Sequence, residues 1–179
     1  MTFKPPYWYH DNIKFSDEDL KKLKYQIDGL RDKKFAREKQ HISTFFLEKY
    51  ERPEKKYLDL YKKIVVDITK SVGIYYKITY EVSIWTQLYD KGMSHNPHHH
   101  AMLSPDWDSA ISWVHFLDVP EQKCFRFTDT KGNTLIPDEQ RNGDIICFPS
   151  WVWHEVLPNN SDTRRLVTSG NIKISHYED

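Results

Sequence analysis

Residues 92–100, which read GMSHNPHHH, decide how we expect this chain to fold. His98 and His100 stand two positions apart, so in an extended strand their imidazoles point to one face while His99 points to the other. A further histidine, His154, follows much later in the segment FPSWVWHEV. A His-x-His pair with one remote histidine is typical of an open-sided metal site.

The composition of the chain indicates one domain with a hydrophobic core. Its 179 residues include 26 Lys and Arg and 26 Asp and Glu, so the net charge is zero and we expect no nucleic-acid partner. Residues 1–10 lack the apolar core of a signal peptide, and no run is long enough to span a membrane. Cys124 and Cys147 each lie in an apolar run and read as reduced core residues. We therefore expect a cytoplasmic protein (in the host cytoplasm if viral); the sequence carries no signal of oligomeric state.

The first 73 residues predict two packing helices that follow an irregular arm over residues 1–15. Ser16 precedes three acidic residues, which is a typical helix start. Pro53 begins a second helix and Gly73 ends it. Apolar residues repeat at intervals of three and four in both helices, so each presents one apolar face to a core.

After Gly73 the apolar residues alternate with a period of two, which predicts β-strands. Turn residues separate the expected strands, which cover residues 74–82, 83–89, 110–119, 124–129, 144–148 and 165–174. Helices at the front and strands behind indicate an α+β fold with a small barrel or jelly roll. We expect one domain over residues 1–179, with helical support in 1–73 and the β core in 74–175.

Two segments resemble the metal motifs of cupin-type double-stranded β-helices. The first has a glycine and the His-x-His pair in residues 92–100, and the second has a glycine, a proline and a histidine in residues 143–154. The match to a plain cupin is imperfect, because no Glu stands at the expected place after His100 and Trp151 replaces a glycine.

Residues 83–175 more closely resemble the iron- and 2-oxoglutarate-dependent oxygenases of phages and marine bacteria, which are often described as prolyl hydroxylases. The matching segments are, in order, WTQLYDKGMSHNPHHH, ISWVHFLDVP, GDIICFPSWVWHEVLPN and RRLVTSGNIKI. The resemblance implies a double-stranded β-helix (a jelly-roll or cupin-like barrel) that uses Fe(II), 2-oxoglutarate and dioxygen.

The resemblance also implies a ligand set. An oxygenase iron takes three protein ligands on one face and keeps the other positions open. The larger superfamily places a carboxylate two positions after the first histidine, where this chain has His100. We favour the metal ligands His98, His100 and His154, with Asp106 as an alternative carboxylate in place of His100. His115 is interpreted as a core residue, and the remaining histidines are interpreted as ordinary polar positions: His10, His41, His95, His99 and His176.

The co-substrate arginine of the superfamily stands eleven positions after the distal histidine, which is Arg165 in this sequence. A planar guanidinium binds the far carboxylate of 2-oxoglutarate through two parallel hydrogen bonds. Tyr89 and Gln87, on the strand before the His pair, are candidates for an additional hydrogen bond to the same carboxylate. Arg164 is expected to face away from the site because residues alternate along a strand.

The expected function is a dioxygenase that hydroxylates its substrate while 2-oxoglutarate is decarboxylated to succinate. The substrate class stays open between a protein side chain such as proline and a small metabolite. Two alternatives are a cupin-like three-histidine metal enzyme that does not use 2-oxoglutarate and a non-catalytic barrel that serves as a binding module.

Overall fold

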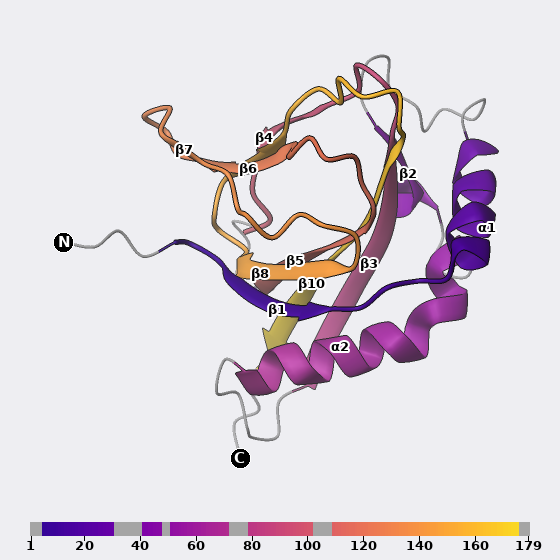
Figure 1. The fold of residues 1–179 in the computed structure, drawn as a ribbon. Coiled ribbons are helices and arrows are strands. Elements are labelled where there is room, and N and C mark those ends of the chain that lie inside the picture. Colours follow the sequence, from indigo (N-terminus) through magenta and orange to yellow (C-terminus); the bar gives the residue numbers. More distant parts are fainter. Residues whose placement is uncertain (1–4, 31–40, 48–50, 72–78, 102–108, 176–179) are drawn as a thin grey trace.

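The computed structural model describes residues 5–30, 41–47, 51–71, 79–101 and 109–175, and it consists of two facing antiparallel sheets with helices outside (Figure 1). The strands of the larger sheet lie in the spatial order β1 (Trp8–Asn12), β8 (Asp144–Pro149), β5 (Ser109–Asp118), β10 (Arg165–Ser175), β3 (Thr79–Tyr89) and β2 (Ile42–Ser43). Those of the smaller sheet lie in the order β4 (His95–His98), β9 (His154–Val156), β6 (Phe125–Thr128) and β7 (Thr134–Leu135). The α+β class and the double-stranded β-helix expected from the sequence are confirmed.

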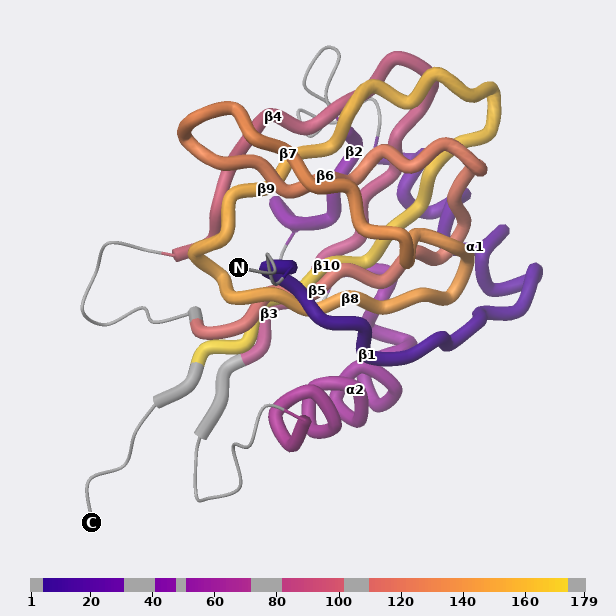
Figure 2. Tube along the Cα trace, turned by 60° about the vertical axis from the view of Figure 1, so that its left-hand side comes forward, coloured from indigo at the N-terminus to yellow at the C-terminus, as the bar shows by residue number. Residues whose placement is uncertain are grey.

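The space between the two sheets is a hydrophobic core, and the larger sheet is covered on both faces. Along β8, Ile146 and Phe148 point into the barrel, while Ile145 and Cys147 point outward toward helix α2 (Leu58–Ser71). Because both faces are buried, this strand is apolar throughout rather than alternating with polar residues. Figure 2 shows α2 beneath the larger sheet, with the smaller sheet on the opposite side.

The first helix has the predicted cap, both helices pack by the predicted apolar faces, and the helix end predicted at Gly73 lies outside the described residues. Helix α1 (Asp17–Asp28) begins after Ser16, whose side chain accepts a hydrogen bond from the backbone N–H of Asp19 at 3.1 Å. A 3-10 turn, η2 (Pro53–Tyr57), precedes α2, and another, η1 (Thr44–Phe46), follows β2. Each fully buried aliphatic side chain contributes about 1.5–3 kcal/mol, so these apolar faces hold the helices against the sheet. None of the helices in the described segments is long and apolar enough to cross a membrane.

Two predictions of secondary structure are wrong. Residues 8–12 form strand β1 rather than an irregular arm, because they pair with β8 and satisfy its outer edge. Within the described residues, the strands predicted over 74–82 and 83–89 are one strand, β3, that begins at Thr79. The chain does not turn at Val82 and Ser83, because β10 pairs with β3 over its whole length.

Candidate metal and co-substrate site

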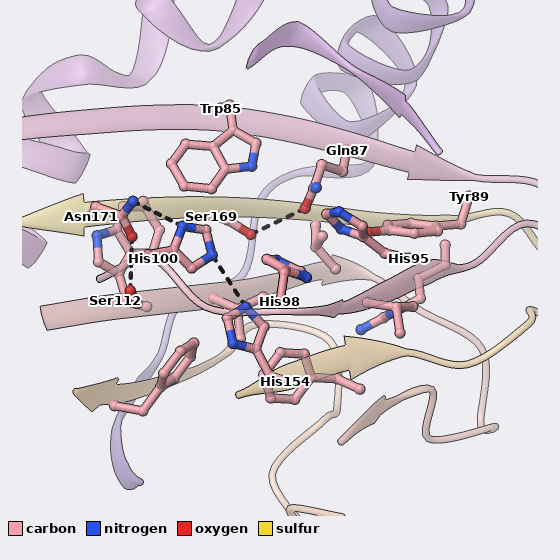
Figure 3. Close-up of a pocket in the computed structure, with 18 residues that line it drawn as sticks. Trp85, Gln87, Tyr89, His95, His98, His100, Ser112, His154, Ser169 and Asn171 are labelled. Atoms are coloured by element: carbon pink, nitrogen blue, oxygen red, sulfur yellow. Dashed lines mark hydrogen bonds between the residues drawn. The ribbon is translucent and has the colours of Figure 1, made fainter. Parts of the chain in front are cut away.

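The cross-strand pairing brings three histidines together inside the barrel. His98 on β4 lies directly opposite His154 on β9, and His100 follows just beyond the end of β4. The ring centroids lie 4.3 Å apart for His98 and His154, 5.1 Å for His98 and His100, and 5.0 Å for His100 and His154. One nitrogen from each ring lies within 4.8 Å of the others, and Figure 3 shows the three rings converging. His99 points outward instead, edge-on to Trp153.

Two of these rings are oriented by backbone carbonyl groups. The Nδ1–H of His98 donates to the carbonyl of Asn96 at 2.8 Å, and the Nδ1–H of His154 donates to that of Val152 at 3.0 Å. A carbonyl only accepts, so it selects the tautomer whose Nε2 lone pair is free to bind a metal. Three imidazoles that leave neighbouring positions open suit Fe(II). The donor set therefore fits the metal that the sequence implies.

Burial keeps the three rings neutral. Desolvation lowers the pKa of His98 and of His154, and it lowers the pKa of His100 to about 3. The neighbouring imidazoles oppose protonation of His100 and His154 further, because two positive charges at such short separations repel each other. A metal ion competes poorly with protons for a charged imidazole, so neutral rings favour binding at neutral pH.

The same cavity contains a buried arginine, Arg165, that has no acidic partner among the described residues. Arg165 on β10 is the register partner of Tyr89 on β3, and its residue is only 1% exposed. Both Nη atoms of Arg165 and the hydroxyl of Tyr89 have no hydrogen-bond partner among the described residues. The guanidinium carbon lies 5.3 Å from the centre of the Tyr89 ring and 5.6 Å from that of Phe116. Burial of an unpaired cation is costly, so this arrangement is suited to a carboxylate from outside the chain.

Gln87 lines the cavity as well, but its amide is already engaged. Its Nε2 lies 3.1 Å from Nε2 of His41, and its Oε1 accepts a hydrogen bond from the hydroxyl of Ser169 at 3.3 Å. The unpartnered Tyr89 hydroxyl is therefore better prepared than the Gln87 amide to bind a co-substrate.

His95 is a cavity residue that the sequence reasoning missed. Its ring stacks on His98 with centroids 4.0 Å apart and lies 4.2 Å from that of His41. Strict alternation would turn positions 95 and 98 to opposite faces, but the register shifts between them, so both rings point inward. Burial lowers the pKa of His95 to about 2. The interpretation of His95 as an ordinary polar position is wrong. No short sequence pattern predicts the register shift between His95 and His98.

Other positions behave as the sequence indicates. Arg164 faces outward and forms ion pairs with Asp28 and Asp90, each at 2.7 Å. His115 is fully buried, and both cysteines are buried and free. Asp106, the alternative carboxylate ligand, lies outside the described residues.

The sequence of the second half of the chain matches a known family. Residues 126–171 match a family model described as "Putative 2OG-Fe(II) oxygenase". This segment is similar to the 2OG-Fe(II) oxygenases. The match includes His154 and Arg165 but begins after the His98–His100 pair. It confirms the enzyme class and the need for Fe(II), 2-oxoglutarate and dioxygen that the resemblance implied. No curated protein sequence matches the chain.

Solved structures of such oxygenases share the fold of this one. A prolyl-4-hydroxylase from Pseudomonas putida is 15% identical, with a TM-score of 0.62 over 94% of this chain and 92% of that one. The epimerase SnoN from nogalamycin biosynthesis, in complex with Fe3+, α-ketoglutarate and nogalamycin RO, is 16% identical, with a TM-score of 0.64 over 94% and 78% of the two chains. A prolyl hydroxylase from Trichoplax adhaerens, in complex with a hypoxia inducible factor peptide fragment, is 12% identical, with a TM-score of 0.61 over 94% and 83%.

Proposed function

We propose that this protein is a dioxygenase in which His98, His100 and His154 hold Fe(II) and Arg165 and Tyr89 hold the distal carboxylate of 2-oxoglutarate. The observation that carries the proposal is a single cavity that joins three inward-facing imidazoles to a buried arginine, both of whose Nη atoms are unpaired within the part of the chain that the structure describes. A metal site alone would not need the arginine, whereas a chelated 2-oxo acid has a second carboxylate to bind.

When bound, Fe(II) and 2-oxoglutarate supply the oxidising chemistry, in which R–H, dioxygen and 2-oxoglutarate become R–OH, succinate and carbon dioxide. The chain contributes binding and orientation. Arg165 and Tyr89 would hold the distal carboxylate of the co-substrate in the cavity that the three histidines also line. Phe125, Phe148 and Val114 line the cavity with apolar surface, which excludes water and strengthens the ionic contacts.

The substrate that we favour is a protein side chain such as proline. Likeness of fold to two prolyl hydroxylases, one of them in complex with a peptide fragment, supports this class. A small metabolite is the second candidate, because SnoN has a similar fold and a small-molecule ligand. Succinate release measured with proline-containing peptides and with hydroxyl-free small metabolites in parallel separates the two.

We also propose that the protein works in the cytoplasm and without a nucleic-acid partner. Two buried, unpaired cysteines suit a reducing compartment. A net charge of zero means that the chain has no overall excess of positive charge to attract the phosphates of a nucleic acid.

The cofactor assignment is tested by mixing the metal-free protein with Fe(II) and 2-oxoglutarate under anaerobic conditions. We expect the weak visible charge-transfer band of the chelate in the wild type and its loss in Arg165→Ala and in His154→Ala. Arg164→Ala is the matched control, since the neighbouring arginine faces outward toward Asp28 and Asp90 and should leave the band intact. A metal-bound protein without the band would favour the cupin-like enzyme or the binding module instead.

A further inference from the structure

His100 differs from the other two histidines in what holds its ring. His98 and His154 each face a carbonyl group, which fixes the tautomer. The Nδ1 of His100 instead lies 3.0 Å from the side-chain amide of Asn171. An amide presents a donor on one side and an acceptor on the other, so this contact serves either tautomer of the ring.

The metal-free arrangement requires one particular direction of hydrogen bonding. Because His154 donates through Nδ1, its Nε2 carries a lone pair, and this atom lies 3.2 Å from Nε2 of His100. The hydrogen between them belongs to His100, whose Nδ1 is then an acceptor. The amide N–H of Asn171 donates to that Nδ1, and the Asn171 oxygen accepts from the hydroxyl of Ser112 at 2.8 Å. Figure 3 shows these contacts as a continuous chain from Ser112 to His154.

A metal on Nε2 of His100 requires the opposite direction. His100 must then carry its hydrogen on Nδ1 and donate it, so the Asn171 oxygen must face the ring. The Asn171 N–H then donates to Ser112, and the single hydrogen of Ser112 turns to Ser150, whose hydroxyl oxygen lies 3.0 Å away. Ser112 and Ser150 are both buried, so no bulk water replaces these partners. The same separations between heavy atoms serve both directions.

Ser150 also fixes the backbone beside the ring. Its carbonyl accepts hydrogen bonds from the backbone N–H of His100 at 2.8 Å and of Ala101 at 3.1 Å. Asn171 and Ser112 are register partners on β10 and β5. The hydrogen bonds that link Ser150, Ser112 and Asn171 are therefore supported by two paired strands and by the residue whose backbone binds His100. Groups that orient a metal ligand are typically held in this way.

We propose that Asn171 is the positioning residue of His100, and that its amide and the Ser112 hydroxyl reverse together when a metal binds, which changes the His100 tautomer from Nε2–H to Nδ1–H. The inference rests on the proposed function, since it takes His100 as a ligand. His100 is neutral in both arrangements: its Nε2 gives up a proton to solvent and its Nδ1 takes one up, so the change of tautomer releases no net proton. A carboxylate at this position, as in the larger superfamily, would need no such partner because it has no tautomer to select.

The tautomers are measured by long-range ¹H–¹⁵N correlation NMR on histidine-labelled protein, with Zn(II) as a redox-inert and diamagnetic probe. We expect His100 to be Nε2–H without metal and Nδ1–H with zinc, while His98 and His154, whose rings face carbonyl groups, keep Nδ1–H in both states. An Nδ1–H signal from His100 in the metal-free protein would overturn the proposal.

Zinc affinities of matched variants test the role of the side chain. Asn171→Leu keeps the branched shape but loses both hydrogen bonds, and loss of a partner that orients a ligand weakens metal affinity roughly 10–100-fold. Asn171→Asp can accept from Nδ1–H and should recover most of that loss. Ser169→Ala is the control on the same face of β10, because Ser169 bonds to Gln87 rather than to a ligand histidine; its zinc affinity should equal that of the wild type.

The outcomes separate the inference from the function beneath it. Weakening in His100→Ala with no weakening in Asn171→Leu overturns the role of Asn171 and leaves the three-histidine site standing. Undiminished zinc affinity in His100→Ala overturns both. If Asn171→Leu fails to fold, an unchanged His100 tautomer on zinc binding in the wild type overturns the inference by itself.

Discussion

Replacing Arg165 by Met should make the metal-free protein more stable and should weaken co-substrate binding. Arg165 is 1% exposed, and both of its Nη atoms lack a partner among the described residues. An unpaired buried ion carries an effective penalty of several kcal/mol. Cation–π contacts with the rings of Tyr89 and Phe116 offset about 0.5–2 kcal/mol of this penalty each. Replacement by an apolar side chain of similar length should therefore raise the free energy of unfolding by about 1–4 kcal/mol.

The loss of binding free energy for 2-oxoglutarate should exceed the gain in the free energy of unfolding. Two charge-assisted hydrogen bonds to a carboxylate are worth about 1.5–3 kcal/mol each. Their loss corresponds to roughly 10²–10⁴-fold weaker binding of 2-oxoglutarate, since about 1.4 kcal/mol is a factor of ten. Burial also lowers the pKa of Arg165, which reflects the same cost of keeping the charge inside.

Urea unfolding of the metal-free proteins measures the first effect, and anaerobic calorimetry of 2-oxoglutarate with the Fe(II)-loaded proteins measures the second. Arg164→Met is the control, because this partly exposed arginine loses only ion pairs near the surface, worth about 0–1 kcal/mol. An Arg165→Met variant that unfolds at lower urea than the wild type and binds 2-oxoglutarate with unchanged affinity would refute the reasoning.

Three further predictions follow from other contacts. His100→Asp restores a His-x-Asp pair, so it should keep the anaerobic charge-transfer band; its disappearance with normal folding would show that this position must be an imidazole. Burial lowers the pKa of His115 to about 4, below its unfolded value, so stability is complete above about pH 6.5 and is lost as the pH falls toward 4. At pH 5 the loss is about 2 kcal/mol, from 1.5 pH units at about 1.36 kcal/mol each. In urea unfolding, the free energy of unfolding of His115→Gln should fall by about 2 kcal/mol less than that of the wild type between pH 7 and pH 5. Gly143→Ala should lower the free energy of unfolding by about 2–5 kcal/mol, because φ is +93° and a Cβ would lie 2.9 Å from side-chain atoms of Asn12 and Lys14. Gly92→Ala, with φ of +81° and no described atom within 4 Å of the added Cβ, should cost only about 1–2 kcal/mol in the same denaturation assay.

Local sequence was sufficient to predict the elements whose pattern is short-range. The Ser16 cap and the apolar faces of the two helices follow from neighbours within one or two turns. The strands followed from alternation, although β1 was missed because its pairing with β8 joins segments more than 130 residues apart. The spacing of His98, His100, His154 and Arg165 also stood in the sequence, and the fold brings these four residues to one cavity.

Only the tertiary structure decided how those residues are held. The bulge that turns His95 into the cavity depends on the register of β4 against β9. The contact between Asn171 and His100 depends on β10 lying beside β5. The lack of a hydrogen-bond partner for the Arg165 Nη atoms among the described residues depends on the side chains that pack around them. Sequence by itself therefore determined which side chains this protein has for metal and carboxylate chemistry. The fold determined their tautomers, their burial and their unmet hydrogen bonds, because those properties come from long-range strand pairing and the exclusion of water.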